Sequence, residues 1–91
     1  MRFAGLMRAK DNLTFKSGVP RRMQWKFPPG LKVEQEYWLQ TQDPTVIFIL
    51  ATEDSASLMG IIADWDDFFD ITITPCITAE EGLALAEQLV R

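Results

Sequence analysis

The chain has 91 residues, of which 47% are hydrophobic and 24% charged, and this length fits one small domain spanning residues 1–91 and excludes a multidomain enzyme. The net charge of -4 is divided unevenly: residues 1–32 hold eight of the nine basic residues and one acid, giving +7, whereas residues 33–91 hold one basic residue and twelve acids, giving -11. This split predicts either that the two segments neutralise each other in the fold or that one meets a partner of opposite charge.

Missing residue types exclude several kinds of chemistry. The chain has no histidine, which removes the usual general base and the commonest metal ligand. Its single cysteine, Cys76, permits no internal disulfide and no Cys-rich zinc site, which is typical of a reduced cytoplasmic protein. The apolar run at residues 3–7 is too short for a signal-peptide core or a membrane-spanning helix. We therefore expect no metal, no cofactor and no membrane association.

The first third of the chain predicts one strand and a poorly regular crossover. Residues 2–9 are a short apolar run, which indicates a strand. Residues 10–30 contain loop-type sequences around Gly18 and Gly30. We expect an irregular crossover there with about two turns of helix, in which Pro20 is the first helical residue and Trp25 lies near the end.

The middle of the chain predicts a β-hairpin. Residues 31–40 alternate with period two, typical of a half-exposed strand: one face holds Leu31, Val33, Tyr37 and Leu39, and the other holds Lys32, Glu34, Glu36 and Gln40. Turn residues follow at 42–45. Residues 46–51 are an unbroken β-branched and aromatic run, which predicts a second strand buried on both faces.

The last part of the chain predicts a helix, an edge strand and a tail helix. Thr52 or Asp54 caps the first helix, whose apolar positions have helical spacing at Leu58, Ile61, Ile62 and Trp65. Residues 69–74 alternate before Pro75, which suits a sheet edge because proline cannot donate to the ladder. Thr78 and Glu81 form a capping box that opens the tail helix, residues 79–90. Its predicted inward stripe is Leu83, Ala86, Leu89 and Val90.

These elements predict an α+β domain with a ferredoxin-like βαββαβ antiparallel sheet, both crossover helices on one face, and an appended C-terminal helix. The first and third strands then lie at the sheet centre. The other face of residues 46–51 would meet water unless something covers it. We expect a homodimer packed sheet to sheet, closing a barrel-like body with two-fold symmetry. The alternative is that the tail helix, residues 79–90, folds over the open face of its own sheet.

Several short motifs, in this order and spacing, resemble a small uncharacterised ferredoxin-like family, a domain of unknown function allied to the dimeric α/β barrels. They are Pro29-Gly30-Leu31-Lys32-Val33, Tyr37-Trp38, Glu53-Asp54, Trp65-Asp66-Asp67 and Ile73-Thr74-Pro75-Cys76-Ile77-Thr78. The resemblance covers about residues 29–81, and residues 2–9 more weakly. It implies a fold of the dimeric α/β-barrel type and a homodimer, and it supplies no catalytic residues. This chain departs from the family at residues 10–28, where the family usually has a longer regular helix.

Four acids gather near the end of the second predicted helix: Asp64, Asp66, Asp67 and Asp70. Their spacing is not that of a calcium loop. Acids in the last turn oppose the helix dipole, each at a cost of about 0.3–1 kcal/mol when exposed. We predict that Asp66 and Asp67 pair with basic residues from the first third of the chain or cap the following turn. Contact with a ligand is the alternative.

The candidate binding site lies on the second predicted strand. Glu34, Glu36 and Trp38 fall on one face of it, and a tryptophan beside two carboxylates suits a pocket for a small, partly apolar molecule. We expect Arg8 and Asn12, at the end of the first strand, to face the same cavity. The alternative is an edge strand whose charges prevent aggregation and whose tryptophan lies in an interface.

The function that we expect is that of a homodimeric module that binds a small molecule or serves as an interaction domain. Some dimeric α/β barrels are cofactor-free oxygenases that use tryptophan, tyrosine or asparagine, types supplied here by Trp38, Tyr37 and Asn12. Basic and aromatic residues at 21–32 suggest binding of single-stranded nucleic acid. The charge of -11 on residues 33–91 argues against that partner, because it repels a polyanion. Trp65 is expected in the core, and Cys76 is expected to be a small buried hydrophobe.

Overall fold

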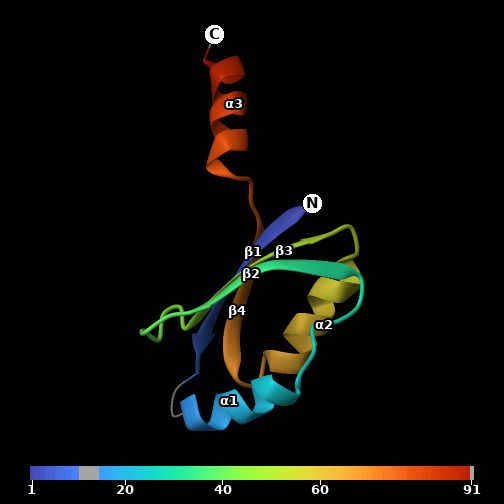
Figure 1. Cartoon of the computed structure of the whole chain (residues 1–91), viewed down its shortest axis with the longest axis vertical. Helices are drawn as coiled ribbons and strands as arrows, with labels where there is room; N and C mark the ends of the chain where they lie inside the picture. Colours follow the sequence, from blue (N-terminus) through green and yellow to red (C-terminus); the bar gives the residue numbers. More distant parts are fainter. Residues whose placement is uncertain (11–14, 91) are drawn as a thin grey trace.

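The computed structural model describes residues 1–10 and 15–90, which form a four-stranded antiparallel sheet with three helices (Figure 1). The elements in chain order are β1 (Arg2–Ala9), α1 (Phe15–Gln24), β2 (Leu31–Trp38), β3 (Val46–Thr52), α2 (Ser55–Trp65), β4 (Phe69–Pro75) and α3 (Ala79–Leu89). The strand order is β2-β3-β1-β4, so the predictions that the first and third strands are central and that the fourth is an edge are confirmed. This α+β arrangement is compatible with a ferredoxin-like fold.

The core lies between the sheet and the helices α1 and α2, which cover the same face (Figure 1). Alternation along β3 points Phe48 and Leu50 to that side, where both are almost completely buried. Ile61 and Trp65 of α2 pack onto them, as the helical spacing predicts. Burial of one such side chain contributes about 1.5–3 kcal/mol, so this layer is the main source of stability.

The start of β2 is fixed against the start of α2 by hydrogen bonds from buried hydroxyl groups. Gly30 has φ +92°, which favours glycine because a side chain there is strained. The Thr52 hydroxyl donates to the Gly30 carbonyl at 2.7 Å, and the Ser57 hydroxyl donates to the Pro29 carbonyl at 2.6 Å. Asp54, one of the two predicted caps, accepts from the backbone of α2 and is its N-cap.

Helix α1 differs from the prediction. It begins at Phe15 and has ten residues, and Pro20 lies inside it rather than at its first position. Gly18 is not a loop residue but a close-approach residue, because a Cβ there would lie 2.8 Å from the ring of Phe68. Packing against the aromatic core thus overrides the helix-breaking tendency of both residues.

Helix α3 projects away from the sheet and does not cover it (Figure 1). The predicted capping box is present, because Thr78 accepts from the Glu81 amide and Glu81 accepts from the Thr78 amide. The predicted inward stripe is wrong, as is the alternative in which this helix folds over its own sheet: Leu83 is 73% exposed and Leu89 is 82% exposed. The radius of gyration of 15.1 Å exceeds the value of about 12 Å expected for a compact domain of this length. Among the described residues, no helix combines the length and the hydropathy needed to cross a membrane.

Candidate functional site

A β-bulge in β2 decides which side chains reach the helix side of the sheet. The register with β3 shifts between Val33 and Gln35. Before the shift, Val33 lies opposite Leu50 and faces the helices; after it, Glu36 lies opposite Phe48 and also faces them. A bulge adds one residue to one strand and so reverses the faces of those that follow.

The bulge separates the three residues that the period-two pattern placed on one face. Glu36 and Trp38 lie on the helix side, whereas Glu34 forms an ion pair with Arg2 on the opposite, open face, with Nε and Oε1 2.8 Å apart. Tyr37 lies on the open face as well, opposite Ile47. The prediction that Glu34, Glu36 and Trp38 share a face is therefore wrong.

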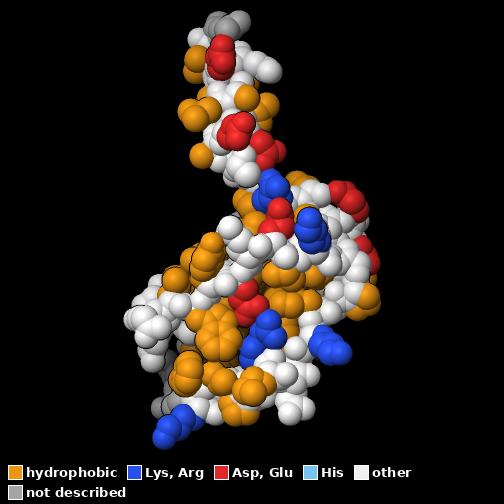
Figure 2. Space-filling model, in the orientation of Figure 1, with side chains coloured by type: hydrophobic (Ala, Val, Ile, Leu, Met, Phe, Trp, Pro, Cys, Tyr) orange, Lys and Arg blue, Asp and Glu red, His pale blue; other side chains and the backbone are white. Residues whose placement is uncertain are grey.

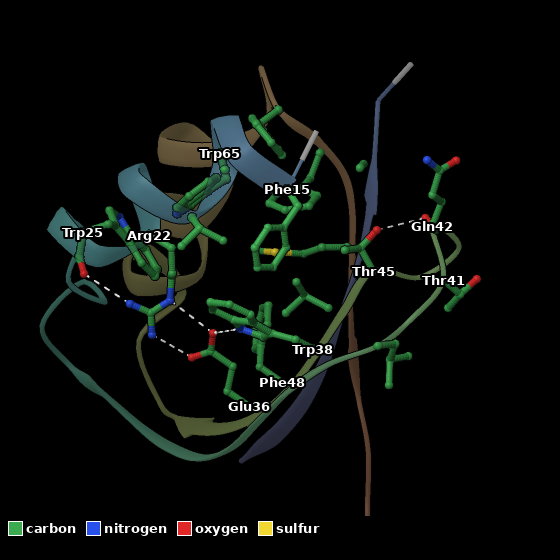
Figure 3. A pocket seen from close by; sticks show the side chains of 18 of the residues that line it. Phe15, Arg22, Trp25, Glu36, Trp38, Thr41, Gln42, Thr45, Phe48 and Trp65 are labelled. Carbon is green, nitrogen blue, oxygen red and sulfur yellow. Dashed lines mark hydrogen bonds and ion pairs between the residues drawn. The ribbon is translucent and has the colours of Figure 1, made fainter. Parts of the chain in front are cut away.

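A cavity of about 510 Å³ lies between α1 and the helix side of the sheet (Figure 3). Its volume is within the range of about 300–1,000 Å³ that is usual for small-molecule sites. The lining is mostly apolar and aromatic, with Met7, Phe48 and Val46 from the sheet, Phe15 and Val19 from α1, and Trp25, Phe27, Trp65, Phe68 and Phe69 around them. The 39–45 loop adds polar side chains, of which Thr41, Gln42 and Thr45 are labelled in Figure 3.

One ion pair lies in this apolar lining. Arg22 of α1 donates to Glu36 of β2 through Nη2 at 2.7 Å and through Nε at 3.1 Å. The indole nitrogen of Trp38 donates to the same carboxylate at 2.8 Å. In Figure 2 an acidic and a basic side chain meet among hydrophobic ones on this side of the molecule. The two-pronged geometry fixes the relative orientation of α1 and β2.

The surroundings of Glu36 keep it charged. Burial raises the pKa of its carboxyl, but the hydrogen bonds from Arg22 and Trp38 together lower that pKa below its ordinary range. The hydrogen bonds that Arg22 donates to Glu36 also raise the pKa of Arg22 above its ordinary value. A carboxylate has about four acceptor sites, and these three donors leave one for a ligand.

Aromatic rings hold the ion pair on one side and narrow the cavity on the other. The guanidinium of Arg22 lies 5.5 Å from the ring centre of Trp25 and 5.3 Å from that of Phe27, within cation–π range. Phe15 meets Trp38 edge to face at 6.3 Å, across the cavity mouth (Figure 3). Ring contacts of this kind restrict side-chain movement, although Phe15 and Trp38 remain 73% and 46% exposed.

Trp65 also lines the cavity, and its buried indole nitrogen has no hydrogen-bond partner among the described residues. Its ring packs edge to face on that of Trp25, with centres 5.6 Å apart. The prediction that Trp65 belongs to the core is confirmed.

The structure brings together only part of the predicted site. Trp38 and Glu36 line the cavity. Arg8 does not face it, because it lies on the open face and pairs with Asp70 at 2.6 Å. The expectation that Arg8 shares the cavity with Trp38 is therefore wrong, and Asn12 lies outside the described residues.

The sequence interpretation missed the contribution of α1 to the cavity. Phe15, Val19 and Arg22 all line it, and their spacing of four and three residues is that of one helix face. The sequence contains this spacing, but we expected an irregular crossover through residues 10–30 and so did not predict a helix face there.

Ion pairs join the basic first third of the chain to the acids that follow it. Arg21 contacts Asp67 through both terminal nitrogens at 2.9 Å, which confirms the predicted pairing for that acid and lowers its pKa. Further pairs link Arg2 to Glu34 and Glu81, Arg8 to Asp70 and Arg22 to Glu36. The uneven charge is thus partly neutralised within the fold. The described residues contain no group of three or more acidic or cysteine side chains placed to hold a metal ion.

Comparison with known proteins gives one match. Residues 4–90 match a family described as "Domain of unknown function (DUF3303)". No curated protein and no solved structure matches the chain. The matched range includes the whole cavity and all of α3.

Proposed function

This chain belongs to the DUF3303 family, whose function is unknown, and we propose that it binds a small, largely apolar molecule in the cavity between α1 and the sheet. The observation that carries the proposal is the ion pair between Arg22 and Glu36, a fixed polar group within a mostly aromatic and aliphatic wall. A few convergent polar groups in an apolar cavity are the usual composition of a small-molecule site.

The chemistry of the wall defines the ligand. Apolar lining favours a ligand that removes hydrophobic surface from water. Arg22 and Glu36 neutralise each other, so a charged ligand would bring an unpaired charge into a mostly apolar cavity, whereas a neutral ligand would not. The remaining acceptor site of Glu36 suits a hydroxyl or N–H group. The best-supported ligand class is therefore a neutral aromatic or aliphatic molecule with one hydrogen-bond donor.

The test uses 2-naphthol, which has this chemistry, titrated into the protein and followed by calorimetry and by the fluorescence of the tryptophans. Ala9 lines the cavity, so Ala9→Leu fills part of it, whereas Ala63→Leu adds the same atoms to the exposed side of α2. We expect Ala9→Leu to weaken binding at least tenfold and Ala63→Leu to leave it unchanged. Equal affinity of the two variants, or no binding of 2-naphthol, indole or cyclohexanol at millimolar concentration, would contradict the proposal.

We also propose that the chain is a homodimer that uses its open sheet face. Leu6, Ile47 and Ile49 lie on that face, because their neighbours in β1 and β3 point to the helices. Half-buried aliphatic side chains side by side on a central part of a sheet are typical of an interface. The cavity lies on the other side of the sheet, so the two proposals are independent.

Two other functions have less support in the geometry. A cofactor-free oxygenase built on Trp38 and Tyr37 requires both side chains in one cavity, and they lie on opposite faces of β2. A single-stranded nucleic acid would need free cations and exposed rings, whereas Arg21 and Arg22 are in ion pairs and Trp25 packs against the core.

A further inference from the structure

Helix α3 has little of the packing that would stabilise it within one copy of the chain. With eleven residues it is shorter than the roughly 12–15 residues that an isolated helix needs for even marginal stability in water. An ion pair joins Glu81, in its first turn, to Arg2 of β1. Beyond that turn it extends from the body along the long axis of the molecule (Figure 1).

The helix is amphipathic even though it projects from the body. At 100° per residue, its apolar residues cover about half of its circumference: they are Ala79, Gly82, Leu83, Leu85, Ala86 and Leu89, with Val90 at the end. The other half carries Glu80, Glu81, Glu87 and Gln88, with Ala84 among them. Figure 2 shows hydrophobic side chains exposed along this projecting helix. Leu89 and Val90 are each 82% exposed.

Contacts at the base of α3 hold it away from its own sheet. The Cys76 amide donates to the Arg2 carbonyl at 3.0 Å, which prolongs the pairing of β4 with β1 beyond Pro75. Arg2 then reaches forward to Glu81 at 2.8 Å. Folding α3 back onto the open face of the same chain would break the ion pair and redirect this segment.

We propose that α3 is an exchange arm, whose apolar half packs on the open sheet face of a second copy of this chain while the partner's α3 packs on the first. This inference rests on the dimer proposed above and specifies what covers its open face. Each copy supplies one unpartnered apolar helix and one uncovered apolar sheet face, so a reciprocal exchange covers both with two-fold symmetry.

Size and charge fit this occupant. An eleven-residue helix is about 16 Å long, and strands of seven or eight residues are about 23–26 Å long, so α3 fits within the length of the face. Within residues 79–90 the charged side chains are all acidic. The open face carries Arg2, Arg8 and Lys32 against Glu34 and Asp70, an excess of one positive charge, so the acids that flank the apolar half of α3 meet a face of opposite net sign.

The first test is the oligomeric state of the full chain, measured by size-exclusion chromatography with light scattering at about 50 µM. Leu89→Glu places a carboxylate on the apolar half of α3, and Gln88→Glu places the same group on the polar half one residue earlier. Both add one acid in the last turn, so their effects on the helix itself match. We expect a dimer for the unchanged chain and for Gln88→Glu, and at least a tenfold weaker dimer for Leu89→Glu.

The second test identifies what lies on the open face. In a Cys76→Ser background, Ile49→Cys and Leu85→Cys are made in separate proteins, mixed, and treated with a short bis-maleimide. An exchange arm gives a cross-linked dimer from the mixture and not from Ile49→Cys alone. A product from Ile49→Cys alone, together with a Leu89→Glu variant that still dimerises, overturns the exchange arm but leaves a dimer with directly stacked sheets.

A monomeric unchanged chain overturns both the arm and the dimer. The cavity proposal is tested separately, by titrating 2-naphthol into the Leu89→Glu variant. There it predicts unchanged affinity, whatever the outcome of the oligomeric-state and cross-linking tests.

Discussion

At the scale of single residues, opposing effects act on the pKa of Glu36. Burial disfavours its charge, while Arg22 and the indole of Trp38 favour it more strongly. The same three side chains line the cavity. The state of Glu36 therefore links the stability of the fold to the geometry of the site.

This balance predicts a loss of stability in acid. A carboxyl whose pKa is lowered in the folded state binds protons more readily when unfolded, so its contribution is complete above about pH 5 and disappears as the pH falls through the lowered pKa. We expect the free energy of unfolding, from urea titrations between pH 7 and pH 3, to fall below pH 5. The fall should be smaller in Glu36→Gln, which has no carboxyl to protonate there. An equal fall in both proteins would contradict the assignment, because Glu34, Asp67 and Glu81 also have lowered pKa values and would then account for all of it.

The β-bulge in β2, which inserts one residue, limits how much of the site can be predicted from the sequence. The sequence led us to Glu36 and Trp38, and both line the cavity. It also assigned Glu34 to the same face, because a period-two pattern contains no signal for a bulge and every later residue changes face with it. Arg8 was misplaced for a related reason: an exposed arginine on the open face of β1 and one on the helix side look the same in a sequence.

At the scale of elements, the pairing of β1 with β3 depends on Gly5, which lies opposite Phe48. A Cβ on Gly5 would lie 2.0 Å from the ring of Phe48, which is 1% exposed. The central pair of strands therefore depends on the absence of a side chain at this position.

Gly5→Ala should lower the free energy of unfolding by about 1–3 kcal/mol, the usual cost of overpacking a core. Thermal and urea denaturation measure the loss. Phe48→Leu removes the ring that the new methyl group meets, so the double variant should be less destabilised than the sum of the two single variants. Additive losses would show that Gly5 and Phe48 do not interact in this way.

Predictability also differs between elements. Helix α2, the strand β3 and the capping box of α3 followed from periodicity and caps, and the structure confirms them. The predicted burial of β3 on both faces is not seen, because its open face is only half-buried. Helix α1 did not, because Gly18 and Pro20 are locally unfavourable and are tolerated only where Gly18 meets Phe68. The direction of α3 depends on contacts of Arg2, which lies 79 residues from Glu81 and has no local signature.

At the scale of the whole molecule, the charge split is a feature of folding. Four arginines of the first third pair with acids of the remainder, and the pairs are spread over both faces of the sheet. Exposed pairs contribute little individually. The pair of Arg22 with Glu36 is the least exposed, with 31% and 19% of the two side chains accessible.

Reversal of both charges in Arg21→Glu plus Arg22→Glu should destabilise the protein by about 2 kcal/mol or more. This is below the 3–5 kcal/mol typical of breaking a fully buried pair, because Arg22 is partly exposed. Lys16→Glu plus Lys26→Glu changes the net charge equally at two exposed lysines that have no ion pair among the described residues. Urea denaturation of both variants measures the difference. Equal destabilisation would show that net charge, and not specific pairing, matters.

Arg2 holds the base of α3 through two kinds of contact, a backbone hydrogen bond and ion pairs of its side chain. Its carbonyl receives the Cys76 amide, while its guanidinium reaches Glu34 of β2 and Glu81 of α3. Salt screens charges with a Debye length of about 10 Å at 0.1 M and about 3 Å at 1 M, so it weakens the exposed ion pairs. The backbone hydrogen bond joins uncharged groups and is not weakened in this way. We therefore expect rising ionic strength to weaken the link between Arg2 and Glu81 while the backbone hydrogen bond keeps the base of α3 attached to β1.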